Sequence, residues 1–153
     1  MTQSLQTLLQ HAERERDAAL ADLLQAEDHA QRVRQQWEQL RAYHAEYAAR
    51  APGHGGRSAG IAQLQAHHAF MQRLDQALAH QQRLLDAAEQ QVPARRQMLL
   101  QRETRVASVR KLAERRHQEQ QRAATRREQQ RSDEAATQRL WRNSAHLRNP
   151  VSP

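Results

Sequence analysis

The sequence predicts an all-α fold, a long antiparallel two-helix coiled coil (an α-hairpin) with an extended C-terminal helix, forming a single coiled-coil domain over residues 1–153. Three observations predict it. The chain contains 27 Ala, 24 Gln and 17 Leu but only five aromatic residues, so helix formers dominate and a sheet is disfavoured. All four Gly lie between positions 53 and 60. On both sides of that stretch, apolar residues recur every seven positions, which is typical of a coiled coil.

The first helix is expected over about residues 3–51. It contains no Gly or Pro, and Pro52 should end it because proline disfavours the α conformation in the preceding residue. Two rows at seven-residue spacing run along this helix and form the predicted seam of the coiled coil. The apolar row is Leu5, Ala12, Ala19, Ala26, Val33, Leu40 and Tyr47, and its companion row is Leu9, Arg16, Leu23, Ala30, Trp37 and His44.

Residues 52–60 are predicted to form a turn, in which Ser58 could cap a second helix over about residues 61–146, followed by a tail over 147–153. Pro93 lies inside this helix and predicts a kink, because proline lacks an N–H and crowds the preceding turn. The alternative is that Pro93 begins a third helix. The second helix has one uniform row and one mixed row. The uniform row is Leu64, Met71, Leu78, Leu85, Val92, Leu99, Val106 and Ala113. The mixed row is His67, Leu74, Gln81, Ala88, Arg95, Arg102 and Val109.

A short turn places the two helices antiparallel, and the rows then define which residues face each other. The expected pairs are Trp37 with Leu74, Leu40 with Met71, and Leu5 with Val106. The first helix is therefore used up near residue 109. Residues 110–148 are expected to continue as a helix that has no partner within the chain.

Positive charge is concentrated in the C-terminal part of the chain. Residues 94–153 carry 15 basic and 6 acidic residues, whereas the rest is close to neutral. This segment is either a solvated helix surface or a surface for an acidic partner, and its abundance of Arg favours carboxylate pairing. Trp141 lies in the seam phase beyond any intramolecular partner, so it could anchor a contact. The candidate binding residues are Arg115, Arg116, Arg122, Arg126, Arg127, Arg131 and Trp141.

Two aromatic residues near the turn, Tyr43 and Phe70, are not explained by the seam. Each lies one position before a seam residue, and in an antiparallel pair the two corresponding flanks lie on the same side. The two rings should therefore converge on one surface. This group of residues either widens the seam or forms an exposed docking surface. The flank and its border comprise Gln36, Leu40, Tyr43, Tyr47, Phe70, Leu74 and Ala77.

Patterns typical of catalysis or metal binding are missing from the sequence. There is no Cys, and the nine His are scattered without an HExxH motif. A two-helix rod also offers no concave pocket. We therefore expect no catalytic residues, no metal site and no cofactor, and neither a secretory signal nor a membrane span is expected.

Three stretches carry a resemblance to a known family. They are ERDAALADLLQAE in the first helix, QLRAYHAEYAAR with HAFMQRLDQALAHQ around the turn, and KLAERRHQEQQRAATRREQQRSDEAATQRL near the C-terminus. In order and spacing they resemble the FliJ family of flagellar export proteins over about residues 5–140. The resemblance implies a non-enzymatic, cytoplasmic component of the flagellar type III export apparatus, peripheral to the inner membrane. It also implies a coiled coil similar to the central stalk of rotary ATPases.

The resemblance further implies the partners of the chain. These are the export ATPase hexamer and its regulator, the cytoplasmic domain of the export gate protein, and export chaperones, with no nucleic acid and no membrane insertion. The basic residues given above are expected to contact the ATPase. The family's gate-binding positions match Gln36, Leu40, Tyr43, Tyr47, Phe70, Leu74 and Ala77 here. The sequence departs from the family at Gln81, where His is usual, and at Pro93.

The expected function is an adaptor that links the export ATPase ring to the export gate and promotes flagellum assembly. Three alternatives stay open at this point. The equivalent stalk protein of a virulence injectisome would share the architecture. A basic nucleic-acid-binding coiled coil would bind with a steep dependence on salt. A dimeric coiled-coil scaffold would have no stalk role at all.

Overall fold

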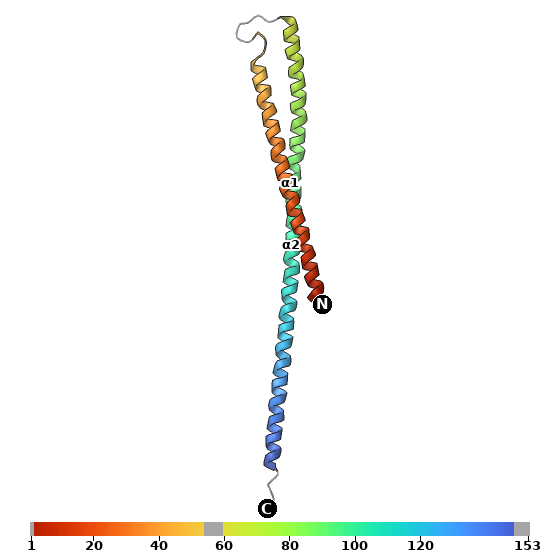
Figure 1. The fold of residues 1–153 in the computed structure, drawn as a ribbon, viewed down its shortest axis with the longest axis vertical. Coiled ribbons are helices and arrows are strands. Elements are labelled where there is room, and N and C mark those ends of the chain that lie inside the picture. The colour runs from red at the N-terminus through yellow and green to blue at the C-terminus, as the bar shows by residue number, and fades with distance from the viewer. Residues whose placement is uncertain (1, 54–59, 149–153) are drawn as a thin grey trace, which may run out of the picture. The chain divides into compact units, whose positions relative to one another are not determined.

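The computed structural model describes residues 2–53 and 60–148, which form two α-helices with no strand among them (Figure 1). α1 spans Thr2–Ala49 and α2 spans Ile61–Arg148. The predicted all-α fold is therefore confirmed. The chain divides into two compact units, which we call the hairpin unit (Gln10–Val106) and the terminal unit (Met1–Leu9 with Ala107–Pro153). The single domain over the whole chain stays a prediction.

The ends of the helices follow from local hydrogen bonding. The last turn of α1 closes with two short-range bonds, in which Arg50 N donates to Tyr47 O at 3.2 Å and Ala51 N to Ala48 O at 3.3 Å. α1 therefore ends at Ala49, two residues before the predicted end at position 51. After Pro52, Gly53 has a φ of 87°. That left-handed conformation is accessible to Gly at little cost.

The start of α2 is set by the carbonyl of Gly60, which accepts hydrogen bonds from Gln63 N and Leu64 N, both at 3.1 Å. The predicted cap Ser58 lies outside the described residues, as does the end of the predicted tail from position 149 onward. α2 continues to Arg148, two residues further than expected.

Pro93 is contained within α2, which runs through it without a break. The alternative of a third helix beginning at Pro93 is therefore wrong. The proline is exposed, so its ring points away from the helix partner and its missing N–H is tolerated by the surrounding turns.

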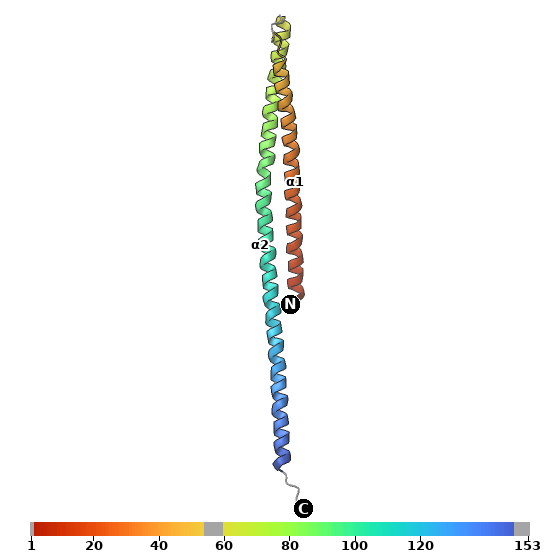
Figure 2. The same cartoon turned by 90° about the vertical axis from the view of Figure 1, so that its left-hand side faces the viewer.

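In the hairpin unit, α1 and α2 lie side by side and antiparallel (Figures 1 and 2). The buried residues all come from the predicted seam rows. Ala30 and Val33 of α1 pack with Leu85 and Ala88 of α2, and Trp37 and Val92 pack against this cluster. The remaining buried seam residues of the unit are Ala12, Ala19, Leu23, Leu74 and Val106.

The predicted register is wrong by about one heptad. Arg34 pairs with Glu89, Gln81 Nε2 donates to Gln36 Oε1 at 3.3 Å, and Val33 packs with Leu85. Each α1 residue thus lies opposite an α2 residue about seven positions later than expected, so Trp37 lies at the level of Gln81 instead of Leu74. The expected pairs Leu40–Met71 and Leu5–Val106 are displaced in the same way. Apolar rows that repeat every seven residues match in either register, and the polar flanks decide between them.

In the terminal unit, the first residues of α1 pack on the part of α2 near position 113. Leu5 and Leu9 line a groove together with Ala113 and Arg116, which also places Leu5 beside Ala113 and not Val106. Beyond His117, Ala123 is the half-buried residue of this unit among those described, and the others are exposed. The exposed stretch therefore begins later than the predicted position 110, because the first turns of α1 lie against α2 as far as His117.

Candidate partner-binding surfaces

An aromatic cluster lies near the turn end of the hairpin unit. The ring centroids of Tyr47 and Phe70 are 4.4 Å apart, and those of Tyr43 and Tyr47 are 6.1 Å apart. His67 stacks on Tyr47 at 5.3 Å with an interplanar angle of 8°. We call Tyr43, Tyr47, His67 and Phe70 the aromatic surface. It joins α1 to α2, and Tyr43, 48% exposed, is its most open described member on α1.

The seven residues predicted for this surface are partly brought together. Tyr43, Tyr47 and Phe70 are in contact as expected, with Tyr47 as the link between the other two. Leu74 is only 7% exposed and is a seam residue, so it offers little area to a partner. The other three, Gln36, Leu40 and Ala77, are exposed or half-buried.

Gln81, the position at which the sequence departs from the family pattern, touches this set directly. Its amide donates to Gln36 Oε1. The Gln81 side chain therefore ties α2 to α1 at one edge of the predicted site.

His67 is a member of the aromatic surface that sequence reasoning missed. It belongs to the mixed row of α2. Because that row contains both polar and apolar residues, a single His in it does not stand out. The available signal was its position three residues before Phe70, which places both side chains on neighbouring parts of one helix face. A groove beside these rings is lined in addition by Arg50, Pro52, Ala66 and Arg73. Apolar rings bordered by two guanidinium groups suit an apolar partner segment that carries carboxylates.

The predicted basic residues lie on α2 of the terminal unit and are mostly exposed. They do not form one patch. Arg115, Arg122 and Arg126 fall within one narrow arc of the helix, since steps of seven and eleven residues return to nearly the same direction. Arg116 and Arg127 share a different face, and Arg116 is half-buried. A groove lined by Gln118, Gln121, Arg122, Thr125 and Arg126 follows the first face.

Trp141 is 72% exposed, and its neighbour Leu140 is similarly open. The two lie ten residues beyond Arg131, or about 15 Å along a helix. The structure therefore separates Trp141 from the arginines with which it was predicted to act. Together with Ser144, Ala145 and Arg148 it lines a groove of its own.

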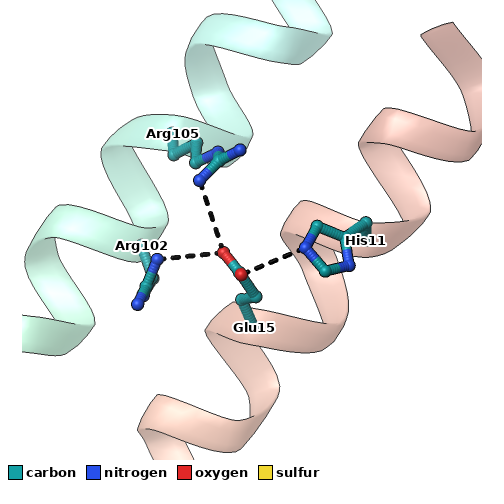
Figure 3. Close-up of polar contacts among 4 residues, drawn as sticks. All are labelled: His11, Glu15, Arg102 and Arg105. Atoms are coloured by element: carbon teal, nitrogen blue, oxygen red, sulfur yellow. Dashed lines mark hydrogen bonds and ion pairs between the residues drawn. The ribbon is translucent and has the colours of Figure 1, made fainter.

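A charged cluster crosses the seam of the hairpin unit (Figure 3). Glu15 Oε2 lies 2.9 Å from Arg102 Nη1 and 3.6 Å from Arg105 Nη1, and Glu15 Oε1 lies 3.1 Å from His11 Nε2. Arg102 is a seam residue and its guanidinium group is part-buried. The carboxylate of Glu15, on the flank of α1, neutralises that charge. Three cationic or protonatable groups thus share one carboxylate.

Within residues 2–53 and 60–148, no three His, Cys, Asp or Glu side chains are grouped closely enough to hold a metal ion. In the same part of the chain, no helix has the length and hydropathy needed to cross a bilayer.

Comparison with known proteins decides the family. The sequence model of the flagellar FliJ protein matches residues 1–145. The chain belongs to the FliJ family. No curated protein and no solved structure matched it. The resemblance seen in the sequence is confirmed, and this FliJ chain is a coiled-coil protein associated with flagellar protein export. Its family is a cytoplasmic, non-catalytic component of that export system.

Proposed function

We propose that this chain is a non-enzymatic adaptor that links the export ATPase ring to the export gate at the cytoplasmic face of the inner membrane. The observation that carries the proposal is the aromatic surface. The family resemblance assigns Tyr43, Tyr47 and Phe70 to gate binding, and Tyr47 contacts both of the other rings although they come from two helices. A partly exposed aromatic cluster of this kind is a favourable anchor for a protein partner.

A second surface with different chemistry supports an adaptor with two partners. The arginines at positions 115–131 are exposed except for the half-buried Arg116 and form two groups around the helix, which suits acidic side chains of the ATPase or its regulator. The aromatic surface is apolar and lies in the other unit. Two surfaces that differ in chemistry can bind two different proteins, and export chaperones would be further candidates for either.

The experiment is a titration of the cytoplasmic domain of the gate protein with the natural chain and with Tyr43→Ala/Phe70→Ala. We expect the variant to bind at least tenfold more weakly, because two anchor rings are removed. Far-UV circular dichroism should be unchanged, since neither residue is among the buried seam residues.

A matched control is Leu20→Ala/Leu24→Ala, which removes two exposed apolar side chains from α1 outside the aromatic surface. It should bind the gate domain like the natural chain. Equal affinity of the aromatic variant and the natural chain would remove the aromatic surface from the proposed function.

A further inference from the structure

In the hairpin unit, the apolar rows of α1 and α2 can pack on each other in two registers, which differ by one heptad. In the observed register, Trp37 lies opposite Gln81 and Leu23 opposite Arg95. A slip of seven residues would place Trp37 opposite Leu74 and Leu23 opposite Ala88, which is at least as apolar. Four Ala side chains on α1 (Ala12, Ala19, Ala26 and Ala30) are too small to interlock strongly with the partner helix. The apolar seam therefore does not choose the register.

We propose that the charged side chains that flank the seam hold the hairpin in the observed one of these two registers. Five contacts between the helices carry the selection, and two of their members, Arg102 and His44, lie in the seam rows themselves. Glu15 pairs with Arg102 and Arg105, Arg34 pairs with Glu89, Arg96 Nη2 lies 3.7 Å from Glu27 Oε1, and His44 Nε2 lies 2.6 Å from Asp75 Oδ1. Charged flanks are the usual means by which coiled coils specify register.

The same flanks disfavour the slipped register. There each α1 residue meets the α2 residue seven positions earlier. Glu27 would meet Glu89, Arg34 would meet Gln82, and His44 would meet His68. Glu15 would exchange its two arginines for one, Arg95. The slip would thus replace the Glu27–Arg96 attraction by a Glu27–Glu89 repulsion. The attractions of Arg34 to Glu89 and of His44 to Asp75 would be lost.

A slip in the opposite direction is excluded more strongly. It would bring Glu27 to Glu103 and Arg34 to Arg96, two like-charge pairs at once, and Glu15 would face the apolar side chains Val109 and Leu112. The flanking charges therefore leave one accessible alternative, the register displaced toward the N-terminal end of α2.

The connection between the helices can accommodate that alternative. In the observed register Ala49 lies opposite about position 69, so the first two turns of α2 extend past the end of α1 (Figure 1). In the slipped register Ala49 would lie opposite Ala62, and the two helix ends would be level. The eleven residues 50–60 would then span a shorter distance, since the shift is about 10 Å along the axis.

The register determines whether Tyr47 contacts Phe70, the ring pair that joins the two helices. In the observed register Tyr47 lies opposite about position 71, one residue from Phe70, and the two ring centroids are 4.4 Å apart. In the slipped register it would lie opposite Leu64, six residues or about 9 Å along the axis from Phe70. The importance of this for gate binding rests on the proposed function, whereas the existence of the second register does not. Exposed ion pairs are individually weak, so a partner that prefers one register could shift the balance.

Disulfide trapping tests the proposal, because the chain has no Cys of its own. Ala30→Cys with Ala88→Cys reports the observed register, and Ala30→Cys with Gln81→Cys reports the slipped one. Each pair is made in the otherwise natural chain and in Glu27→Arg/Arg34→Gln. In that variant, the arginine introduced at position 27 would face Arg96 in the observed register and Glu89 in the slipped one. Disulfide yield in the monomer is measured under mild oxidation, with helical content followed in parallel.

In the natural background, we expect the 30/88 pair to form at least tenfold more disulfide than the 30/81 pair. In the charge variant, the 30/81 yield should rise several-fold and exceed that of 30/88, with helical content retained. The control Arg14→Gln/Glu38→Arg makes the same exchanges at exposed positions of α1 away from the flanks and should behave like the natural chain.

Three results would overturn the proposal. They are an unchanged preference for 30/88 in the charge variant, low yields of both pairs, and a loss of helical content, which would mean that the charges hold the hairpin together and do not choose its register. Gate affinity is a separate measurement. If the aromatic variant binds the gate normally, the proposed function fails, and the disulfide result still decides the register.

Discussion

The guanidinium carbon of Arg41 lies 5.2 Å from the centroid of the Trp37 ring, one helical turn away on α1. The guanidinium group lies over the face of the indole. The Trp37 ring also packs against the Ala30–Val33–Leu85–Ala88 cluster. The Nε1 of Trp37 is buried and has no hydrogen-bond partner among the described residues. Trp37 therefore combines favourable apolar burial and a cation–π contact with an unfavourable unpaired donor.

Replacing Trp37 by Phe should change the free energy of unfolding by only about 1 kcal/mol, because the lost contact area is offset by removal of the unpaired N–H. Trp37→Ala should destabilise by about 3 kcal/mol, since it leaves the cluster uncovered. Urea denaturation followed by circular dichroism measures both. A loss of several kcal/mol for Trp37→Phe would show that removal of the unpaired donor offsets little of the lost contact area.

Leu84 and Leu85 are adjacent on α2 but differ in exposure, at 45% and 3%. Leu85→Ala should lower stability by about 2–4 kcal/mol, because it opens a cavity in the main cluster of the seam. Leu84→Ala removes the same atoms from an exposed position and should cost less than about 1 kcal/mol. The two variants form a matched pair in thermal or urea unfolding. Similar losses for both would contradict the assignment of the seam face.

Pro93 should destabilise α2, because a proline inside a helix removes one backbone hydrogen bond and crowds the preceding turn. Since the residue is exposed, Pro93→Ala has no tertiary contact to disrupt and should raise stability, by up to about 3 kcal/mol. Gln91→Ala, an exposed substitution two residues away, serves as the control and should have little effect. A lower melting temperature for Pro93→Ala would mean that the proline stabilises a required bend.

Much of the fold could be predicted because burial follows helical phase. Seven-residue spacing was enough to identify Ala12, Ala19 and Val33 as buried, without any knowledge of the partner helix. The register could not be predicted in the same way, because a slip of seven residues leaves the apolar phase unchanged. It depends on flank pairs such as Arg34–Glu89, which are visible only when both helices are compared position by position.

The candidate site shows the same division. Convergence of Tyr43 and Phe70 on one side followed from the flank rule and is confirmed through their shared contact with Tyr47. His67 was missed because a polar residue in a seam row is ordinarily counted as an irregularity. Trp141 was added to the arginines because it keeps the seam phase beyond any partner helix, although the linear geometry of a helix keeps it about 15 Å from Arg131. The roles of these residues in binding stay predictions.

The proposed ATPase contact makes a prediction that separates geometry from net charge. Arg122→Glu/Arg126→Glu reverses two charges on one face of α2, beside the groove that follows that face. We expect weaker binding to the export ATPase, by at least tenfold at moderate ionic strength, because acidic partner groups would then be repelled. Gate binding should be unaffected, since the aromatic surface lies in the hairpin unit.

Arg139→Glu/Arg142→Glu makes the same change in net charge outside the predicted set and is the matched control. Titration of the purified ATPase with each variant, read as affinity and as hydrolysis rate, compares them directly. If position matters, only the first variant loses binding, and the loss shrinks as salt screens the interaction. If both variants weaken binding equally, the arginines act as a diffuse cationic surface and the assignment of individual residues in the segment 115–131 is wrong.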